Sequence, residues 1–467
     1  MSRSGRPGGE GGGEVPRAPS AAGELEPAHL ASASLDELPQ YVSVVIPAAG
    51  EEAHIGALLA RVDEILATRV RKHELIVVVP HPEDPTGGVA REAGARVLVQ
   101  KRPGYGGALK EGIQAARGDH VVTMDADFTH PPEALATLLA HYDAAEVVIC
   151  SRYVEGGSAR MSLTRNLLSR VLNAVYSRVL AVPVRDMSSG FRIYPRHVFD
   201  ELEITAENYD VLQEILVKIY CLGWRVVEIP FAYMPRVGGE SHARPFGFAP
   251  HFLRTLGVLF SLRNDFRSAD YDSRAHDSLV LPQRYWQRRR FEIVTRMMGD
   301  ASPRADVGCG SSRIIQSRPD SVGLDISQPK LRFLRRTNPK RVRGTTFALP
   351  FRTGSLGGVV HSQVIEHVPF DRRIFRELNR VLRPGGVLVI GTPDYGRVQW
   401  RVIEWLYKLL MPNSYGDDHI THYTRRGLTE ELAEAGFGIT GYEYILGGEL
   451  VIRCVKREEL PSGSDAR

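Results

Sequence analysis

The chain has few cysteines, no long apolar run and no excess of one charge, and each scarcity removes a class of protein. Its four cysteines stand far apart among 467 residues and form no Cys-x-x-Cys pair, which excludes a disulfide scaffold and a zinc site of that pattern. No stretch of about 18 apolar residues occurs, so no membrane span is predicted. The 59 basic and 55 acidic residues nearly cancel, to a net charge of +4, which argues against nucleic acid as a partner.

Residues 1–40 contain no aromatic side chain and consist mostly of Gly, Pro, Ala, Ser and Glu. A segment of this composition buries too little apolar area to offset the entropy lost on ordering, so we expect it to be disordered. It also lacks the basic and apolar stretches of a secretory signal. Together with cysteines that we interpret as reduced thiols, this predicts a cytoplasmic protein.

Ordered structure is expected from Tyr41 onward, in two regions where short apolar strands alternate with helical patterns. A chain of 467 residues exceeds the roughly 100–200 residues of one domain. In the first region, residues 41–262, strands are predicted at 42–47, 75–79, 95–99, 120–124, 146–150 and 225–230. Helices are predicted there at 52–68, 105–117, 132–142 and 162–181. This alternation indicates an α/β fold, with a mostly parallel sheet and helices on both faces.

A second α/β region is predicted over residues 285–457, after a charged linker at 263–284 and before a C-terminal tail at 458–467. Its strands are predicted at 304–307, 321–326, 342–347, 357–363, 386–392, 442–446 and 450–456. Its helices are predicted at 328–336, 371–383, 400–411 and 424–435. The two regions share a fold class but not their motifs, so we expect two different domains and no internal repeat.

Two carboxylates follow the predicted strand at 120–124, in the segment Asp125-Ala126-Asp127. Ligands of open α/β sheets gather at the carboxyl ends of the strands, and alternate side chains of a strand point the same way. Asp125 and Asp127 are therefore placed to share a hard divalent cation, Mg²⁺ or Mn²⁺, together with substrate phosphates. Taken alone, the pair has a plainer interpretation as two solvated acids in a loop.

Four further segments surround this pair in the sequence. They are Gly104-Tyr105-Gly106-Gly107, Ser151-Arg152-Tyr153, Asp186-Met187-Ser188-Ser189-Gly190-Phe191-Arg192 and Arg236-Val237-Gly238-Gly239-Glu240-Ser241-His242. With the Asp pair, and in this order, they make residues 41–262 resemble the family 2 glycosyltransferases of the GT-A fold. Within that family the chain looks most like the dolichol-phosphate, or polyprenyl-phosphate, mannosyltransferases.

The resemblance implies a nucleotide sugar as donor and assigns roles to individual residues. The nucleotide-sugar site would comprise Pro47, Glu51, Asp125, Ala126, Asp127, Arg165 and Ser241, with Asp125 and Asp127 as metal ligands. The catalytic residues would be Asp127, Arg152 and Arg236. Arginine suits a diphosphate and an acceptor phosphate because its planar guanidinium binds two phosphate oxygens at once. A lipid-phosphate acceptor is already ionised near neutral pH, so one inverting displacement needs no strong base.

Departures from that family leave the substrates open. Val79 and Pro80 stand where the family has an acidic pair that reads the base, unless Glu83 or Asp84 replaces it, so the donor is either GDP-mannose or a UDP-sugar. The acceptor is a polyprenyl phosphate or, as the alternative, a hydroxyl of a surface polysaccharide. Residues 246–262 predict either an interfacial helix, giving peripheral contact with the cytoplasmic face of a membrane, or a helix packed on the catalytic domain.

In the second region a glycine-rich turn, Asp306-Val307-Gly308-Cys309-Gly310, follows a predicted strand. Glycine at such a turn lets the backbone approach a ligand closely. Asp325 ends the next predicted strand, where an acid can hold both hydroxyls of a ribose. The same arrangement serves dinucleotides, so these residues alone do not identify the ligand.

Further segments narrow that choice. They are Ala348-Leu349-Pro350-Phe351, Val359-Val360-His361-Ser362-Gln363-Val364-Ile365-Glu366-His367-Val368, residues 376–386 and Gly391-Thr392-Pro393. With the glycine-rich turn they make residues 285–457 resemble the class I S-adenosylmethionine-dependent methyltransferases, which have a Rossmann-like fold. The cofactor-binding residues this implies are Asp306, Gly308 and Gly310 at the methionine part, Asp325 at the ribose, and Leu349 and Gln363 at the flanks.

The sequence constrains the methyl-transfer step less. His367 is a candidate general base, and the alternative is a structural hydrogen bond. His419 and His422, with Asp417, have a spacing that can suit a metal. No further ligand is evident beside them, so we favour ordinary loop histidines.

Taken together, these motifs predict a bifunctional transferase. The first domain would glycosylate a polyprenyl phosphate or similar acceptor, and the second would methylate a related small molecule or glycolipid. In the alternative, one domain is a decayed binding scaffold, because Ser312 and Thr345 stand where the methyltransferase family usually has a glycine and an acid.

Overall fold

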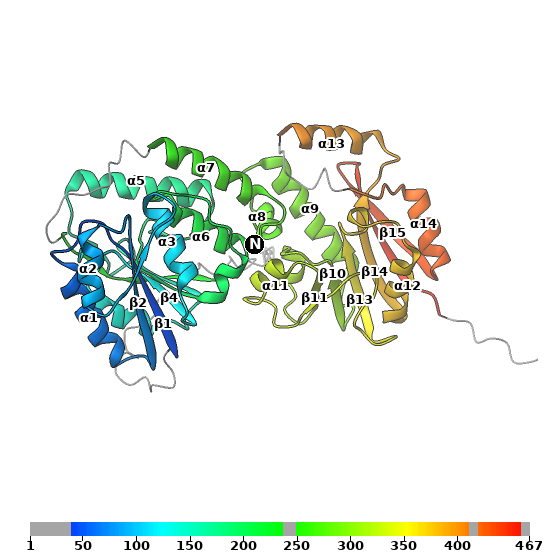
Figure 1. Ribbon diagram of the computed structural model, residues 1–467. Helices are drawn as coiled ribbons and strands as arrows, with labels where there is room; N and C mark the ends of the chain where they lie inside the picture. The colour runs from blue at the N-terminus through cyan, green and yellow to red at the C-terminus, as the bar shows by residue number, and fades with distance from the viewer. Residues whose placement is uncertain (1–38, 237–248, 411–418, 459–467) are drawn as a thin grey trace, which may run out of the picture.

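The computed structural model describes residues 39–236, 249–410 and 419–458, which fold into two α/β domains (Figure 1). Two predicted site residues, Ser241 and Asp417, lie outside the described residues. So do nearly all of the predicted terminal segments, of which only residues 39, 40 and 458 are described.

The first domain is built on a seven-stranded sheet with the order β3-β2-β1-β4-β7-β5-β8. Its strands are β1 (Tyr41–Pro47), β2 (Lys72–Val79), β3 (Arg96–Val99), β4 (His120–Thr123), β5 (Val147–Ser151), β7 (Arg192–Pro195) and β8 (Val226–Pro230). β7 runs antiparallel to β4 and β5, whereas the other neighbouring pairs are parallel. The sheet is therefore mixed, although mostly parallel as predicted. The short strands β6 (Ser158–Ala159) and β9 (Ala232–Tyr233) form a separate parallel pair.

Helices cover both faces of this sheet because its inner strands are apolar on both sides. In β1, Val42, Val44 and Ile46 enter one core, and Val45 enters the other, as expected from side chains that alternate along a strand. The helices are α1 (Ile55–Ala67), α2 (Pro85–Glu92), α3 (Gly104–Ala115), α4 (Glu133–Ala140), α5 (Leu163–Val179), η3 (Arg196–Glu201), α6 (Val211–Cys221) and α7 (Ala249–Asn264). α1 and α4 pack on the first core, and α3 and α6 pack on the second.

The second domain has a seven-stranded sheet in the order β12-β11-β10-β13-β14-β16-β15. Its strands are β10 (Arg304–Val307), β11 (Val322–Asp325), β12 (Arg341–Arg343), β13 (Leu356–Ser362), β14 (Leu382–Pro393), β15 (Phe437–Ile445) and β16 (Glu449–Lys456). β16 is antiparallel to β14 and β15, and the remaining pairs are parallel. The predicted strand at 342–347 ends at Arg343, because Thr345 pairs with Ala348 across a tight turn.

The helices of the second domain precede or connect these strands (Figure 1). They are α9 (Leu281–Met298), α10 (Arg313–Gln316), α11 (Gln328–Leu334), η4 (Ile365–His367), α12 (Arg372–Val381), α13 (Val398–Leu410) and α14 (Arg425–Glu434). The parallel strands β10, β11 and β13 lie side by side, so the turns that follow them meet at one edge of the sheet.

The two domains meet along a packed seam between α11 and the chain that follows α6. The guanidinium of Arg332 lies 3.5 Å from the centre of the Trp224 ring and forms an ion pair with Glu201 at 2.7 Å. Gly223 has φ +80°, and a Cβ at this position would stand 2.3 Å from the carbonyl oxygen of Pro329. The backbones of the two domains are therefore in direct contact.

The segment 263–284, predicted as a linker, is folded against both domains. It contains α8 (Tyr271–His276) and the first turn of α9. The backbone N of Ala269 donates to the carbonyl of Cys221 in the first domain at 2.8 Å. Asp272 forms an ion pair with Lys330 of the second domain at 2.8 Å. The domain boundaries from the sequence stay predictions, and this segment joins the two domains through contacts as well as through the chain.

Candidate active sites

The first candidate site lies after β4, at the carboxyl end of the strand. The hydroxyl of Tyr105 donates to the Asp125 carboxylate at 3.1 Å, and 33% of the Asp125 side chain is exposed. The backbone N of Asp125 donates to Nδ1 of His130 at 2.9 Å, and Nε2 of the same ring lies 3.6 Å from the Asp125 carboxylate. Burial lowers the pKa of His130, so the ring stays neutral at pH 7 and fixes the direction of the Asp125 loop.

The backbone around Asp125 and Asp127 lets neighbouring side chains approach the Asp pair closely. Phe128, directly after Asp127, has φ +59°, a conformation that costs energy for a non-glycine residue and is typical of functional loops. A Cβ on Gly190 would lie 3.0 Å from the Tyr105 hydroxyl and 3.5 Å from a carboxylate oxygen of Asp125. The absence of a side chain at Gly190 therefore lets Tyr105 and Asp125 meet.

Asp127 is held by Arg236. Nε and Nη2 of Arg236 lie 2.8 Å from Oδ2 of Asp127, and Nη1 lies 3.6 Å from the Glu51 carboxylate. Thr129 donates its backbone N and its hydroxyl to the other oxygen of Asp127, at 3.1 and 2.5 Å. Burial acts to raise the pKa of Asp127, but the hydrogen bonds from Thr129 and the charge of Arg236 outweigh it and lower the pKa. Asp127 is therefore an ionised carboxylate with both oxygens engaged.

Other predicted residues of this site lie at its edge. Pro47 ends β1, Ala126 is buried between the two acids, and Arg165 is exposed in the first turn of α5. Arg165 is close enough to lower the pKa values of Tyr209 and Tyr233, against the larger effect of their burial, which raises both. Arg165 therefore stands at the rim of the site, where it faces solvent.

Arg152 is placed differently from the role that the resemblance implies. Its guanidinium donates to both carboxylate oxygens of Asp186, at 2.7 and 2.6 Å, and to the hydroxyl of Ser188 at 2.7 Å. Only 9% of its side chain is exposed. This geometry is that of a residue that positions the end of β5, because its Nε and Nη2 atoms donate to protein acceptors. Direct contact between Arg152 and a diphosphate stays a prediction.

Asp84 is buried beside the loop that follows β1. Its carboxylate caps α2 by accepting from the backbone N of Thr86 at 3.0 Å, and it lies 3.3 Å from the backbone N of Gly50. Glu83, by contrast, is exposed. Asp84 therefore braces the loop after β1, and recognition of the base by either acid stays a prediction.

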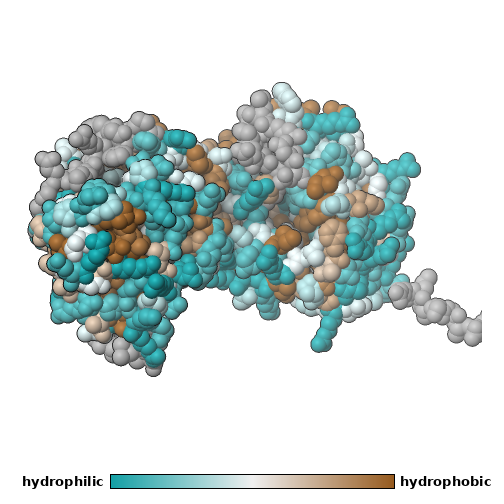
Figure 2. All heavy atoms as spheres, viewed as in Figure 1, coloured by the Kyte–Doolittle hydropathy of each residue, from teal (hydrophilic) through white to brown (hydrophobic). Residues whose placement is uncertain are grey.

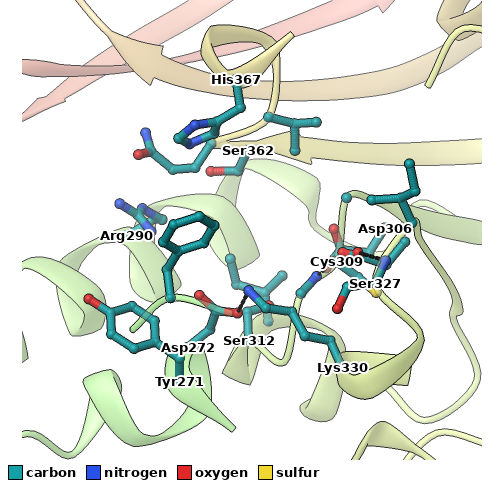
Figure 3. Close-up of a pocket in the computed structure, with 18 of the residues that line it drawn as sticks. Tyr271, Asp272, Arg290, Asp306, Cys309, Ser312, Ser327, Lys330, Ser362 and His367 are labelled. Carbon is teal, nitrogen blue, oxygen red and sulfur yellow. Dashed lines mark hydrogen bonds and ion pairs between the residues drawn. The ribbon is translucent and has the colours of Figure 1, made fainter. Parts of the chain in front are cut away.

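The second candidate site is a cavity of about 710 Å³ at the carboxyl ends of β10, β11 and β13, within the range of about 300–1,000 Å³ usual for small-molecule sites. Figure 3 shows Asp306, Cys309 and Ser327 along one wall, with Ser362 and His367 across the cavity from them. The surface of this domain is hollowed beside α9, and apolar side chains border the hollow (Figure 2).

Two glycines give this cavity its shape at the end of β10. Gly308 has φ +75°, and a Cβ there would stand 2.3 Å from Val364. Gly310 has φ +53°, and a Cβ there would stand 2.5 Å from the Asp272 carboxylate. The backbone N of Gly310 donates to Asp325 at 2.7 Å. The turn thus depends on glycine at both positions and is tied to the acid that ends β11.

Buried polar atoms of this cavity lack protein partners among the described residues. They are Oδ2 of Asp306, Oγ of Ser362 and Nε2 of Gln363. Gln363 also adopts φ +60°, a strained conformation for a non-glycine residue. Buried polar groups are normally hydrogen-bonded, so these atoms fit a polar ligand such as the predicted cofactor. Burial, together with the carboxylates of Asp325 and Asp272, raises the pKa of Asp306 to about 8.

Most of the residues predicted to bind the cofactor line the cavity, and one of them does not. The cavity is lined by Asp306, Gly308, Gly310, Asp325 and Gln363. Leu349, expected at the flank of the cofactor, lies instead in the hydrophobic core, because Glu377 of α12 accepts from its backbone N at 2.7 Å. Phe347, in the same turn, lines the cavity. The pattern located this turn but not the side chain that faces inward.

Some residues of the two sites carry no signal in the sequence. Asp272 and Lys330 form their ion pair in the wall of the second cavity (Figure 3). Asp272 also accepts from the backbone N of Ser311 at 3.0 Å. It lies in the predicted linker, where no motif marks it. His130 was missed as well, since a single histidine after the Asp pair has no diagnostic spacing.

One end of the second cavity carries two histidines. The rings of His367 and His419 lie 4.9 Å apart, centre to centre, and the Tyr395 hydroxyl lies 2.7 Å from Nδ1 of His419. Burial raises the pKa of the neighbouring Glu366 carboxyl to about 8. This end therefore offers the nitrogen and oxygen atoms that an acceptor could contact, including the predicted base His367.

Comparison with known proteins identifies both domains. Residues 43–203 match Glycosyl transferase family 2, and residues 305–390 match the family described as Methyltransferase domain. A dolichyl-phosphate hexose transferase from Haloferax volcanii is 32% identical over 210 residues, which are 44% of this chain and 87% of that protein. The chain belongs to glycosyltransferase family 2. The glycosyltransferase domain is followed by a methyltransferase domain, so the protein is a transferase whose second domain implies S-adenosylmethionine as methyl donor.

Two further likenesses cover the glycosyltransferase and methyltransferase domains separately. A dolichol-phosphate mannosyltransferase from Pyrococcus furiosus is 31% identical over 229 residues, which are 46% of this chain and 63% of that relative. The chain thus matches less than two thirds of the length of that relative. A solved S-adenosylmethionine-dependent methyltransferase from Thermotoga maritima is 19% identical, with a TM-score of 0.33, over 37% of this chain and 91% of its own.

Proposed function

We propose that this protein is a bifunctional transferase, which moves a hexose from a nucleotide sugar to a polyprenyl phosphate and methylates a related glycolipid or small molecule. The observation that carries the first half is the set of Asp125, Asp127 and Arg236 at the end of β4, in a family 2 glycosyltransferase domain. Relatives named for dolichyl-phosphate hexose transfer and dolichol-phosphate mannosyl transfer support a polyprenyl phosphate as acceptor. The donor is GDP-mannose or a UDP-sugar.

The residues of the glycosyltransferase site are suited to stabilise a nucleoside diphosphate as the leaving group. Hard oxygen ligands fit Mg²⁺ or Mn²⁺, which would neutralise diphosphate charge when bound. Asp125 presents a carboxylate that is one third exposed, whereas Asp127 is engaged by Arg236. We infer that Arg236 leaves Asp127 when substrate arrives and turns to the phosphate oxygens, which frees Asp127 to bind the metal and to orient the acceptor. Because a phosphate acceptor is already ionised, the residues need only align it for an inverting displacement.

A polyprenyl acceptor requires an apolar surface near Arg165, and α5 provides one. Leu163, Leu167, Val171 and Val175 recur every four residues along this helix, with exposures of 86, 65, 51 and 42%, and thus share one face. Arg170 flanks this face and Arg178 follows it near the end of the helix, which suits the headgroups of anionic lipids. We therefore propose peripheral contact of α5 with the cytoplasmic face of a membrane. No helix among the described residues is long and apolar enough to cross one.

The predicted interfacial helix at 246–262 corresponds largely to α7, which faces two ways. Leu259 is buried in the core of the glycosyltransferase domain, and the Tyr176 hydroxyl of α5 donates to the carbonyl of Phe252 at 2.5 Å. Leu253 and Phe260 are exposed, at 70 and 49%. One side of α7 therefore packs on the domain, and we propose that the exposed side, beside α5, takes part in the membrane contact.

The membrane proposal is tested by pelleting the full chain with vesicles of anionic phospholipid. We expect Leu167→Glu and Val171→Glu to reduce pelleting at least about fivefold, because each places a charge on the apolar face. Ile439→Glu, on an exposed residue of β15, is the matched control and should pellet like the unaltered chain. Equal pelleting of all variants, or none with the unaltered chain, would remove α5 as the contact.

The methyltransferase cavity suits a cofactor on one side and an acceptor on the other. S-adenosylmethionine, when bound, supplies a methyl group on a positively charged sulfur. Asp306 and Gln363 would hold it through the polar atoms that have no partner in the described part of the chain, and Asp325 would bind its ribose. His367 lies at the other end of the cavity and, with no metal ion bound there, would accept the proton of a hydroxyl acceptor.

The glycosyl transfer is tested by incubating the full chain with Mg²⁺ or Mn²⁺, a short polyprenyl phosphate and labelled GDP- and UDP-sugars. Label should enter the organic phase with one donor, should be lost in Asp125→Asn, and should persist in Asp143→Asn, a control at an exposed acid. Label that stays in water with every donor would favour a polysaccharide hydroxyl as acceptor. For the second domain, no binding of S-adenosylhomocysteine at millimolar concentration would indicate a decayed scaffold.

A further inference from the structure

Three side chains that can ligate a metal converge at the acceptor end of the methyltransferase cavity. Glu366 and His367 belong to η4, directly after β13, and His419 comes from the chain before α14. One ligand atom from each lies within 4.8 Å of the others. The backbone N atoms of Ile420 and Thr421 donate to the carbonyl of Glu366, at 2.7 and 3.0 Å, so the backbone itself brings His419 to the other two residues.

The carboxylate of Glu366 is the second observation that points to a ligand. The residue is fully buried, and its Oε1 atom has no hydrogen-bond partner among the described residues. Its Oε2 atom accepts from the Thr392 hydroxyl at 3.2 Å. The neighbouring cation, Arg290, forms an ion pair with Glu449 at 2.8 Å. A buried carboxylate oxygen without a partner is costly, and a bound cation would satisfy it.

His419 is oriented as a metal ligand usually is. The Tyr395 hydroxyl lies 2.7 Å from its Nδ1 atom and 3.3 Å from the Glu404 carboxylate. Metal-binding histidines generally engage their second nitrogen in such a hydrogen bond, which fixes the ring. Nε2 of His419 is then the atom directed to the cluster.

We propose that Glu366, His367 and His419 bind a divalent transition-metal ion that holds an oxygen atom of the methyl acceptor. Two imidazoles and one carboxylate suit Zn²⁺, Mn²⁺, Fe²⁺ or Co²⁺ better than Mg²⁺. Bond lengths of about 2.0–2.2 Å require the three ligand atoms to close by about an ångström, which side-chain rotation allows. The site is separate from the Asp pair of the glycosyltransferase domain and uses none of its residues.

The ion would act on an acceptor that carries a hydroxyl or phenol. Coordination lowers the pKa of such a hydroxyl, so that its proton leaves to water. An oxygen lone pair then forms the bond to the methyl carbon while the carbon–sulfur bond breaks, and neutral S-adenosylhomocysteine remains. This role rests on the proposed methyl transfer, whereas the binding of the ion does not.

The test uses the full chain, freed of metal by a chelator and titrated with Co²⁺ alone. Asp125→Asn is introduced throughout, so that the glycosyltransferase site is silenced. We expect one Co²⁺ per chain, with a visible absorption band from nitrogen ligands. His419→Ala and Glu366→Gln should weaken binding at least about tenfold and abolish the band.

His422→Ala is the matched control. This exposed histidine lies on the same stretch of chain, and its ring stacks on Tyr395 at 3.9 Å between ring centres, but it is not part of the cluster. Its variant should bind Co²⁺ like the background protein. The proposal is overturned if the background protein binds no Co²⁺ with a nitrogen-ligand band, or if folded His419→Ala binds it equally well. A chain that binds Co²⁺ but methylates nothing would contradict the proposed function alone.

Discussion

The proton on Asp306 should control how tightly the methyltransferase domain binds its cofactor. The carboxyl is 5% exposed, and Oδ2 has no partner among the described residues. Burial, then Asp325 and Asp272, raise its pKa to about 8, so the free protein carries a neutral Asp306 at pH 7. A cofactor with a cationic methionine part favours the ionised form. Binding should therefore release a proton below pH 8.

The size of this effect follows from the pKa. If the cofactor binds the ionised form, affinity falls about tenfold, or about 1.4 kcal/mol, for each pH unit below 8. Between pH 8, where about half of Asp306 is ionised, and pH 6, where about 1% is, the loss is about 50-fold. The stability of the free protein depends on pH in the opposite sense to the cofactor affinity, because a carboxyl whose pKa is raised in the folded state binds its proton more strongly there. Its contribution to stability is present below the unfolded pKa, near 4, and is lost as the pH rises through 8.

Calorimetric titration with S-adenosylhomocysteine measures both quantities. Titrations at pH 6, 7, 8 and 9, in buffers of different ionisation enthalpy, should show close to one proton released at pH 6 and 7, and little at pH 9. Asp306→Asn cannot ionise, so it should bind with an affinity that varies little over this range and release no proton from this position. The reasoning is refuted if the unaltered chain binds with the same affinity at pH 6 and pH 8 and releases no proton at either.

Three substitutions test the remaining geometry. Gly190→Ala places a methyl group 3.0 Å from the Tyr105 hydroxyl and should lower the initial rate of sugar transfer about tenfold, since overpacking costs about 1–3 kcal/mol; an unchanged rate would contradict it. Arg236→Ala removes a cation from beside the Asp pair, so titration with Mn²⁺ in the absence of nucleotide should show binding about tenfold tighter, while the rate of sugar transfer falls. Weaker Mn²⁺ binding would count against the proposed move of Arg236 from Asp127 to the phosphate oxygens. Arg332→Ala removes the guanidinium that lies 3.5 Å from the Trp224 ring centre and should lower the free energy of unfolding in urea by about 2 kcal/mol; no change would mean that the seam contributes little.

The sequence predicted those parts of both sites that lie next to one another along the chain. Asp125 follows a buried strand, and Gly308 and Gly310 follow another, so strand ends alone placed them at the binding edges. Sequence position could not place Asp272, because it reaches Lys330 and Ser311 across the fold. No local pattern records contacts of that kind.

Differences of detail have a similar physical origin, and the contact of Arg152 with a phosphate stays a prediction. Leu349 was expected at the cofactor, but the pairing of Thr345 with Ala348 and the hydrogen bond from its backbone to Glu377 turn it into the core. Arg152 stands where phosphate contact is expected, yet Asp186 occupies its guanidinium. In both cases the position along the chain was informative, while the direction of the side chain depended on a partner distant in sequence.

The seam at Gly223 has a consequence for what happens when the chain is cut. The backbone of Pro329 lies so close that a Cβ on Gly223 would stand 2.3 Å from its carbonyl oxygen, and Arg335 reaches across to Glu146. Detached halves would each expose a surface shaped for the other, including the indole of Trp224. A protease that nicks the segment between the domains would therefore produce two fragments that stay associated and elute together, separating only in denaturant.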